Sequence, residues 1–480
     1  MRLSAHAVGI LLAATLTAIP AASVSAQATE ASEAAEPVGP QRPNILFIIT
    51  DQQHAEMMSC AGNKYLATPA MDRLAREGIR FANAYVTNPV CVPSRISMAT
   101  GVMAGRFGVL NNGMRATLPQ EVSQASLGKL FKAAGYDTFY GGKTHMSPEL
   151  EPRQAGYDEY FADQREALPG ACIEFMQRKR DRPFLAVTSF INPHDICFAY
   201  SAYAGKSPKG PSSVEQLYQQ AKRLPPEQLP PLPDNFRVPE LEPEAIELNA
   251  KTTATTPSGI MRKTYDEHEW RMYRWIYCRL TEQVDEHIGR LLDALQRNGL
   301  ADKTLVIFTS DHGDMDACHR LASKGTFYEQ SVRVPLLMRY PGHVAPGQTD
   351  RHLISSGLDL LPTLCDYSGI EIPSFAQGLS LRPLAEGQAD NAWRKFVVTE
   401  NHTGRMLRSQ HFKYCVYRDG QLRESLVDLR RDPGELNNLA ADPDYQATLQ
   451  EHRQLLQQWI DSTEDADARS LNVDSPAVGR

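Results

Sequence analysis

The sequence predicts an α/β fold in which a mostly parallel sheet is flanked by helices, with a smaller α+β subdomain at the C-terminal end. Three observations support this prediction. Long apolar runs end in polar residues, as strands buried on both faces of a sheet do. Segments with helical spacing alternate with these runs, which is typical of parallel sheets. From about residue 373 the pattern changes to short strands separated by turns.

The first strands and helices alternate. Residues 42–53, RPNILFIITDQQ, form an apolar run with a polar end and predict a buried strand. Residues 68–86 begin with Thr-Pro and then space their apolar residues as one face of a helix does. Residues 126–143 contain a helix, a Gly-Tyr stop and a strand in succession. This alternation favours strand–helix–strand units.

Later segments extend the same pattern. Residues 182–194, RPFLAVTSFINPH, and 304–314, TLVIFTSDHGD, predict two more buried strands. Residues 269–299 predict a long helix that Gly299 closes, since glycine commonly terminates helices. Residues 206–260 are too rich in proline for regular structure. We interpret them as a long surface insertion that either covers the functional site or is a plain solvated loop.

Residues 373–480 form the predicted C-terminal subdomain. The stretches KFVVTEN, HFKYCVYRDG and ESLVDLRRDPGELNN indicate short strands with turns, which predict a small antiparallel sheet. PDYQATLQEHRQLLQQWI indicates an amphipathic closing helix. The preceding residues 42–372 then form the main α/β domain.

The N-terminus predicts export. Arg2 precedes the apolar run AVGILLAATLTAI, and SVSA places small residues for cleavage after Ala26. Residues 1–26 are therefore interpreted as a cleaved signal peptide, with an uncleaved anchor as the alternative, and residues 27–41 as a disordered leader. No other apolar segment is long enough to span a bilayer. We expect a secreted or periplasmic protein with no integral membrane segment after cleavage.

The amino-acid composition restricts the molecules that the protein can bind. The formal net charge is −7, which gives no basic surface for nucleic acid. It leaves room for an anionic substrate, because the local charge of a site can oppose the net charge. The eight cysteines are a thin scatter for 480 residues, so disulfides, although export permits them, are not the main framework.

Two predicted strands end in side chains that bind metals. Asp51 and Gln52 close the first strand, and Asp311 and His312 follow the strand at 304–314. Because sites in parallel α/β sheets form at the carboxyl ends of strands, these pairs can converge despite their distance in sequence. Carboxylate and amide oxygens suit a hard divalent cation. Capping and turn roles are the alternative for the aspartates.

Cationic and proton-transferring residues occupy other loop positions. Lys143 and His145 lie in GGKTH after a strand, His194 in NPHD after another, and Lys324 in ASKGTFYE. The alternation of Lys143 and His145 predicts that both lie on one face of an extended segment. Taken singly, each is most simply a solvated lysine or a hydrogen-bonded histidine. Together they predict a positively charged site around a metal, as an oxyanion ester requires.

Residues 88–101, NPVCVPSRISMATG, leave Cys91 open as a disulfide partner, a packed thiol or a nucleophile. CVPSRISMATG resembles the sulfatase signature, in which C/S-x-P/A-x-R is followed by Thr-Gly. GYDTFYGGKTH resembles the second signature of the family, and NILFIITDQQ and LVIFTSDHGD resemble its two metal-binding strand ends. KGTFYEQSVRVPLLMRYPG resembles the segment that bears the family's lysine, and LVDLRRDPGELNNLA resembles its C-terminal hallmark. These motifs run in the family's order from about 42 to 460. The chain therefore resembles the type I, formylglycine-dependent sulfatases of the alkaline-phosphatase-like superfamily.

The resemblance implies a sulfuric ester hydrolase, and export suggests a carbohydrate sulfate as substrate. A formylglycine-generating maturation enzyme reads the C-x-P-x-R context, and Cys91 would be the residue that it oxidises to formylglycine. One hydroxyl of the hydrated aldehyde would attack sulfur, and the other would later collapse to the aldehyde and expel sulfate.

The resemblance also implies a role for each site residue. Arg95 would stabilise the formylglycine loop, and Lys143 and Lys324 would bind sulfate oxygens. His145 would take up the proton as the aldehyde is regenerated, and His194 would protonate the leaving oxygen together with Lys324. The implied metal ligands are Asp51, Gln52, Cys91 in its modified form, Asp311 and His312.

Two positions depart from the commonest family pattern. The family more often has Asp where this chain has Gln52, and often Asn where it has His312. Calcium remains the first expectation, and the lost charge and added nitrogen admit manganese or another transition ion. The Gln/His pair also resembles choline sulfatases and phosphonate monoester hydrolases, so a phosphonate or phosphate ester hydrolase is the alternative function. A non-catalytic binding protein is a further alternative, which the complete set of site residues disfavours.

Overall fold

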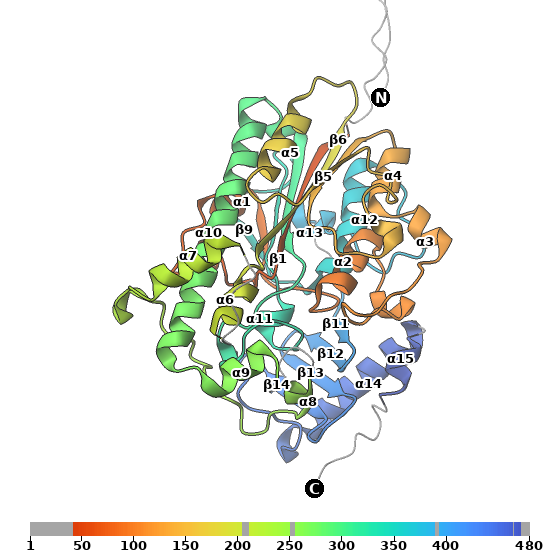
Figure 1. The fold of residues 1–480 in the computed structure, drawn as a ribbon. Helices are drawn as coiled ribbons and strands as arrows, with labels where there is room; N and C mark the ends of the chain where they lie inside the picture. Colours follow the sequence, from red (N-terminus) through yellow and green to blue (C-terminus); the bar gives the residue numbers. More distant parts are fainter. Residues whose placement is uncertain (1–41, 204–210, 250–254, 389–392, 464, 472–480) are drawn as a thin grey trace, which may run out of the picture. The chain divides into compact units, whose positions relative to one another are not determined.

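A large, mostly parallel sheet forms the centre of the protein (Figure 1). The computed structural model describes residues 42–203, 211–249, 255–388, 393–463 and 465–471, so the predicted signal peptide and leader lie outside the described residues. The strands of this sheet are β1 (Asn44–Asp51), β2 (Ile79–Phe81), β4 (Asp137–Gly142), β5 (Glu159–Ala162), β6 (Phe184–Pro193), β7 (Thr304–Ser310), β8 (Leu336–Arg339) and β9 (Gln348–Asp350).

The strand order is β5-β4-β6-β1-β7-β8-β2-β9. All neighbours are parallel except β8, which runs antiparallel to both β7 and β2. The four strands predicted from apolar runs, β1, β4, β6 and β7, are adjacent in the middle of the sheet. The predicted fold class is confirmed, and the antiparallel β8 is an addition that the sequence patterns did not reveal.

The central strand β1 is buried on both faces. Ile45, Phe47 and Ile49 belong to one hydrophobic core, whereas Leu46 and Ile48 belong to the other. Because successive side chains of a strand point to opposite faces, a two-sided strand needs an unbroken apolar run. The polar residues that follow the run therefore mark the point where the chain leaves the core.

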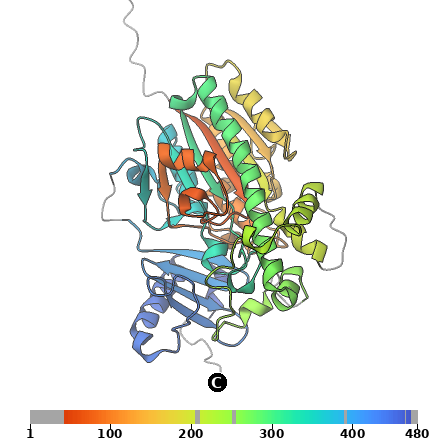
Figure 2. The ribbon, with the colours of Figure 1, turned by 90° about the vertical axis from the view of Figure 1, so that its left-hand side faces the viewer.

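Helices cover both faces (Figure 2). One core contains residues of α1 (Pro69–Glu77), α5 (Leu168–Gln177) and α10 (Glu267–Arg297). The other contains residues of α2 (Cys91–Thr100), α4 (Leu127–Ala133) and α12 (Ser356–Ser368). Short helices α3 (Gln120–Gln124) and α11 (Glu329–Val332) lie between these elements along the chain, and α13 (Arg382–Ala385) follows α12. A parallel pair of short strands, β3 (Ala84–Tyr85) and β10 (Ile354–Ser355), lies apart from the large sheet.

The long helix α10 confirms the sequence prediction and begins two residues earlier than expected. The Asp266 side chain accepts a hydrogen bond from the backbone of Glu269, whose side chain bonds back to the backbone of Asp266. This reciprocal arrangement stabilises the N-terminus of the helix. Gly299 adopts a φ of 65°, the left-handed conformation that ends the helical segment.

The prediction that residues 206–260 lack regular structure is wrong in part. The described residues of this stretch contain α7 (Ser212–Ala221), α8 (Ala245–Leu248) and the start of α9 (Pro257–Thr264), and α6 (Ile196–Tyr203) precedes it. The prolines cluster between α7 and α8, so proline limits helix formation there and not at the two ends. Val214 and Leu217 of α7 are buried in a core shared with α10, which explains why this end folds.

The C-terminal subdomain contains an antiparallel sheet and a closing helix. Its strands follow one another as β11 (Phe396–Asn401), β12 (Gly404–Ser409), β13 (Phe412–Tyr417) and β14 (Glu424–Asp428). Leu449, Leu456 and Ile460 of α14 (Gln446–Thr463) pack against this sheet, and α15 (Ala466–Arg469) follows. The domain boundary at residue 373 stays a prediction.

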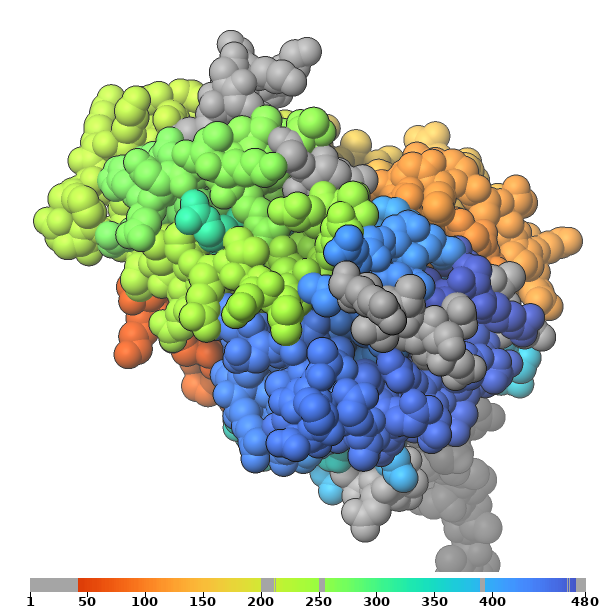
Figure 3. All heavy atoms as spheres, turned by 90° about the horizontal axis from the view of Figure 1, so that it is seen from below, coloured from red at the N-terminus to blue at the C-terminus, as the bar shows by residue number. Residues whose placement is uncertain are grey.

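The insertion and the C-terminal subdomain lie side by side (Figure 3). The backbone of Glu244 donates to the carbonyl of Gln421 at 3.2 Å, and Asn438 donates to the carbonyl of Leu241 at 3.2 Å. Within the described residues, no helix is both long and apolar enough to cross a membrane.

Candidate active site

The predicted site residues lie where the central strands end. Asp51 is the last residue of β1, and Asp311 and His312 directly follow β7. Because β1 and β7 pair in parallel, with Thr50 opposite Ser310, their carboxyl ends bring these side chains together. Lys143 follows β4 and His194 follows β6 at the same edge.

A fully buried group of potential metal ligands forms at this edge. One ligand atom from each of its members lies within 4.8 Å of every other, and the members are Asp51, Cys91, Asp311 and His312. Sγ of Cys91 lies 3.1 Å from Nε2 of His312 and 4.0 Å from Oδ1 of Asp51. Nδ1 of His312 lies 3.0 Å from the backbone oxygen of Gly313, so Nε2 is the nitrogen directed into the group.

Gly313 permits this geometry. A Cβ atom there would lie 1.8 Å from the backbone oxygen of Gln330, a distance that no side chain tolerates. The loop after β7 can therefore pass close to Gln330 only with glycine at this position.

Arg95 connects the two strand ends. It lies one helical turn after Cys91 on α2, so both side chains face the same direction. Its Nε donates to Asp311 at 2.8 Å, and Nη2 donates to Asp51 at 3.0 Å. Nη1 donates to the Ser189 hydroxyl at 2.7 Å. One buried guanidinium therefore fixes and partly neutralises both carboxylates.

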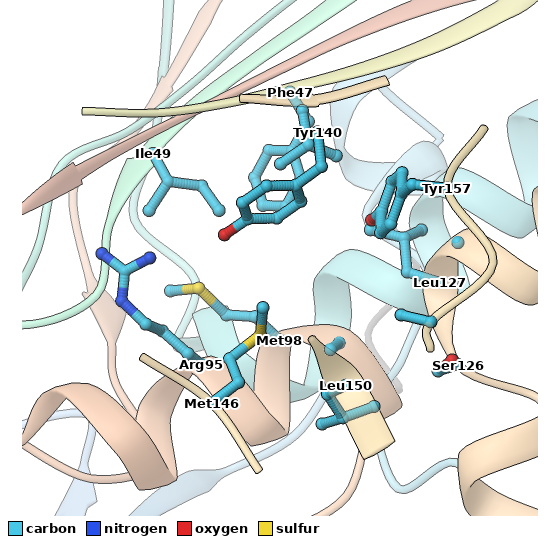
Figure 4. A pocket seen from close by; sticks show the side chains of 14 residues that line it. Phe47, Ile49, Arg95, Met98, Ser126, Leu127, Tyr140, Met146, Leu150 and Tyr157 are labelled. Carbon is cyan, nitrogen blue, oxygen red and sulfur yellow. The ribbon is translucent and has the colours of Figure 1, made fainter. Parts of the chain in front are cut away.

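The stem of Arg95 lies at the edge of an apolar cavity beside α2 (Figure 4). Met98, Met146 and Tyr140 line the cavity next to Arg95. The Tyr140 hydroxyl donates to the backbone oxygen of Lys143 at 2.7 Å. Hydrophobic packing on one side and hydrogen bonds on the other thus hold the guanidinium in place.

Two lysines bring positive charge to Cys91. Nζ of Lys324 lies 3.4 Å from Sγ of Cys91 and 2.7 Å from Oε1 of Gln52. Nζ of Lys143 lies 3.8 Å from Sγ and forms an ion pair with Asp51. These ammonium groups come from loops that are far apart in sequence, and both point at the same side chain.

Burial and neighbouring charges shift the pKa values of three members of the buried ligand group. Burial by itself raises the pKa of Asp51, but the nearby cations, Lys143 foremost, hold that pKa well below its usual range. Burial and the charge of Asp51 raise the pKa of Asp311 to about 6. Burial and Asp51 also oppose ionisation of the Cys91 thiol, yet Lys324 and Lys143 hold its pKa well below the usual value. The site therefore stabilises negative charge at position 91.

His194 lies beside this group. Its Nε2 is 4.0 Å from Oδ1 of Asp51. Burial, reinforced by Lys324, lowers the pKa of His194 well below its usual value. The imidazole is therefore neutral at pH 7 and acquires a proton readily only when an added anion offsets the lysine charge.

His145 does not share the burial of the cluster. The chain leaves the extended conformation at Gly142, where φ is 95°, and His145 has a φ of 48° and an exposed side chain. The expectation that Lys143 and His145 lie on one face of an extended segment is therefore wrong, because β4 ends at Gly142 and the period-two rule applies only within a strand.

Gln52 is buried, and both its backbone and its side chain form hydrogen bonds. It has a φ of 69°, which is unusual for a residue with a side chain, and its backbone amide donates to Asp311 at 3.2 Å. Its Oε1 accepts from Lys324, as described above, and its Nε2 donates to Oδ2 of Asp314 at 2.6 Å. The Tyr277 hydroxyl donates to its backbone oxygen at 2.5 Å.

The sequence patterns do not reveal three residues that lie around the side chain of Gln52. Asp314 accepts from Gln52, and the thiol of Cys197 lies 3.4 Å from Oε1 of Gln52. The Tyr273 hydroxyl donates to Asp314 at 2.8 Å. Asp314 ends the DHGD stretch and could have been selected there, whereas Tyr273 is indistinguishable from other apolar-face residues of α10.

Comparison with known proteins defines the class. The family model described as Sulfatase matches residues 43–370. A second model, described as N-sulphoglucosamine sulphohydrolase, C-terminal, matches residues 317–462. The chain belongs to the sulfatase family. It is an enzyme, a sulfuric ester hydrolase, with a buried group that is consistent with a metal site and a formylglycine cysteine.

Particular relatives agree with this assignment. The chain is 31% identical to the Delta 4,5-hexuronate-2-O-sulfatase of Bacteroides thetaiotaomicron, over 91% of this chain and 92% of that protein. The solved structure of a 2-O GAG sulfatase matches with a TM-score of 0.77 and 29% identity, over 90% of this chain and 94% of that one. The phosphonate monoester hydrolase of Agrobacterium radiobacter matches with a TM-score of 0.68 at 23% identity, over 87% of this chain and 95% of that one, and shares the fold.

Proposed function

We propose that this sulfatase removes sulfate from a carbohydrate, with formylglycine at position 91 and a divalent cation beside it. The observation that carries this proposal is the position of Cys91, whose Sγ lies within 4.0 Å of both a buried carboxylate and two ammonium groups. Such surroundings suit a nucleophile next to a sulfate group. Relatives that act on a hexuronate and on a glycosaminoglycan support a carbohydrate substrate.

The residues at the strand ends fit a divalent cation. Two carboxylates, one imidazole nitrogen and the Cys91 sulfur come together in a buried group. The buried amide oxygen of Gln52 accepts from Lys324, whose ammonium group also lies beside Cys91. These donors suit calcium, and the nitrogen also admits manganese. A bound cation would neutralise charge on sulfate oxygens and lower the pKa of a neighbouring hydroxyl. The proposed ligands are Asp51, Gln52, Asp311, His312 and the modified side chain of Cys91.

The chain's own groups would bind the ester and move its protons. Lys143 and Lys324 would hold sulfate oxygens, since both ammonium groups already face position 91. Addition of water to the formylglycine aldehyde would give two hydroxyls on one carbon, one to attack sulfur and one to re-form the aldehyde as sulfate is expelled. His194 would donate a proton to the leaving oxygen once sulfate charge has raised its pKa. His145 remains the proposed proton acceptor during release of sulfate, and it is exposed.

A substrate panel tests the proposal. Matured enzyme would be assayed against 2-O-sulfated uronate saccharides, 6-O-sulfated glucosamine, choline sulfate, an aryl sulfate and a phosphonate monoester. We expect the highest kcat/KM for a sulfated saccharide and measurable activity towards the aryl sulfate. A higher kcat/KM for the phosphonate would instead favour the alternative function, which the Gln52 and His312 pair suggests.

The leaving-group role of His194 predicts a selective defect. His194→Ala should reduce turnover of a sugar sulfate about 100-fold more than turnover of an activated aryl sulfate, because a sugar alkoxide needs a proton to leave and a phenolate hardly does. Steady-state kinetics on both substrates would measure the gap, and thermal melting would check the fold. His411→Ala, at an exposed position between β12 and β13, is the matched control. Equal losses on both substrates would exclude this role.

Export is proposed separately. The N-terminal run suggests a cleaved signal, so mature protein from the native host should begin at Gln27. N-terminal sequencing of secreted or periplasmic protein would measure the start. A protein that retains residues 1–26 would contradict cleavage.

A further inference from the structure

We propose that Asp314 is a positioning residue that fixes the side-chain amide of Gln52, so that its oxygen and not its nitrogen faces the metal-ligand group. This inference rests on the proposed function in one respect, because it takes Gln52 as a cation ligand. It adds a residue outside the group and a physical reason why glutamine can serve at this position.

A buried glutamine has two ends of nearly equal size and opposite polarity. Oε1 accepts hydrogen bonds and binds cations, whereas Nε2 donates and repels them. Gln52 is fully buried, so water cannot compensate for the wrong orientation. The neighbours of the amide therefore decide whether Gln52 can act as a ligand.

Two neighbours with fixed polarity select the orientation. Oδ2 of Asp314 accepts from Nε2 at 2.6 Å, and Nζ of Lys324 donates to Oε1 at 2.7 Å. An ammonium group can only donate. Backbone amides donate to both side-chain oxygens of Asp314, Asp316 to Oδ1 and Ser323 to Oδ2, so both oxygens act as acceptors. In the reversed orientation, Nε2 would face Lys324 and Oε1 would face the carboxylate of Asp314, so both contacts would be repulsive.

Asp314 is the neighbour of Gln52 that has no proposed role in binding substrate. Lys324 is the proposed sulfate-binding residue, so its contact with Gln52 competes with substrate. Asp314 has no such second task. Its Oδ1 accepts from the Tyr273 hydroxyl and the backbone amide of Asp316, both at 2.8 Å, and its Oδ2 accepts from the backbone amide of Ser323 at 3.1 Å. These donors hold the carboxylate at the rear of Gln52.

A polarity swap tests the proposal. Asp314→Asn keeps the shape but offers an amide nitrogen to Gln52, so that Gln52 would turn and present Nε2 to the cation. Adding Gln52→Glu removes the problem, because both ends of a glutamate are oxygens and one can accept from the asparagine. The double variant has the same formal charge as the wild type, and both variants lose the Ser323 contact equally.

The measurement is cation binding rather than turnover. Full-length chain, stripped with chelator, would be titrated calorimetrically with CaCl2 and separately with MnCl2, and its melting temperature would be recorded. We expect Asp314→Asn to weaken cation binding about 10- to 100-fold, the usual effect of losing a partner that orients a ligand. The double variant should return to within about fivefold of the wild type, since the hydrogen bond is restored with reversed polarity. The control Asp302→Asn, the same chemical change at an exposed position before β7, should change binding by less than about threefold.

Each result decides the proposal. Unchanged cation binding in a folded Asp314→Asn variant would overturn it, and so would a folded double variant that binds no better than the single one. If Asp314→Asn does not fold, the double variant decides alone, and its failure to fold would show that Asp314 serves the fold only. A wild-type chain that binds neither cation would overturn both this inference and the proposed metal site, whereas wild-type binding with no effect of Asp314 would leave the proposed function standing.

Discussion

Replacing Cys91 with alanine is expected to abolish sulfate ester hydrolysis. The loss should be on the order of 10,000-fold or more, as is usual when the nucleophile of a covalent mechanism is removed. The lysines at 3.4 and 3.8 Å from Sγ would still attract sulfate, so binding should survive where turnover does not. The measurement is steady-state hydrolysis of an aryl sulfate and a sugar sulfate, with inhibitor binding as a check on the intact pocket.

The same residue carries a chemical signature. Active protein should yield a tryptic peptide covering residues 81–95 that is about 18 Da lighter than the unmodified one, since sulfur is exchanged for oxygen and two hydrogens are lost. Peptides that contain the other cysteines serve as the internal control and should keep their thiol mass. A fully active preparation with an intact thiol at Cys91 would refute the proposed nucleophile.

Asp311→Asn is expected to remove most of the bound cation and to reduce turnover by about 100-fold or more. The Asp311 carboxylate accepts from Arg95 at 2.8 Å and lies in the buried ligand group, so the amide would lose a charge that both the guanidinium and a cation require. Metal content by mass spectrometry and kcat/KM on an aryl sulfate would be measured together.

Asp302→Asn supplies a matched control. Asp302 precedes β7 as Asp311 follows it, and its side chain is exposed, so the same chemical change at the other end of the strand should alter neither metal content nor rate. Full activity of the metal-free wild type, or of Asp311→Asn without bound metal, would contradict the metal assignment.

Much of the fold could be predicted because strands that are buried on both faces of a sheet require unbroken runs of apolar residues, which are visible in the sequence. The apolar runs that became β1 and β7 had to end where the chain left the core, and polar residues stood at those ends. Parallel pairing then brought Asp51 and Asp311 together, which follows from topology alone. The order of the strands and the antiparallel β8 did not follow, because they depend on which helices cover which face.

Other parts depend on geometry that spacing does not reveal. The sequence predicts that Lys143 and His145 lie on one face of an extended segment, but the positive φ angles of Gly142 and His145 show that the chain is not extended there. The contact between Gln52 and Asp314 joins a strand end to a loop far away in sequence, and only the folded chain brings them together. The helices at the ends of the proline-rich insertion form because α7 buries apolar residues against α10, a tertiary effect that local composition underestimates.

The burial of Cys91 sets an order of events in biosynthesis. Only 1% of this residue is exposed, and it is the first residue of a helix whose neighbours come from segments up to Lys324. The next four residues of the helix are buried as well, so the folded chain does not expose this segment to another protein. The proposed conversion would therefore take place on the newly made chain, before Lys324 and the strands around it have closed over the thiol. On the proposed function, chain that folds before its conversion would keep a shielded thiol, so the yield of active enzyme would depend on the relative rates of maturation and folding.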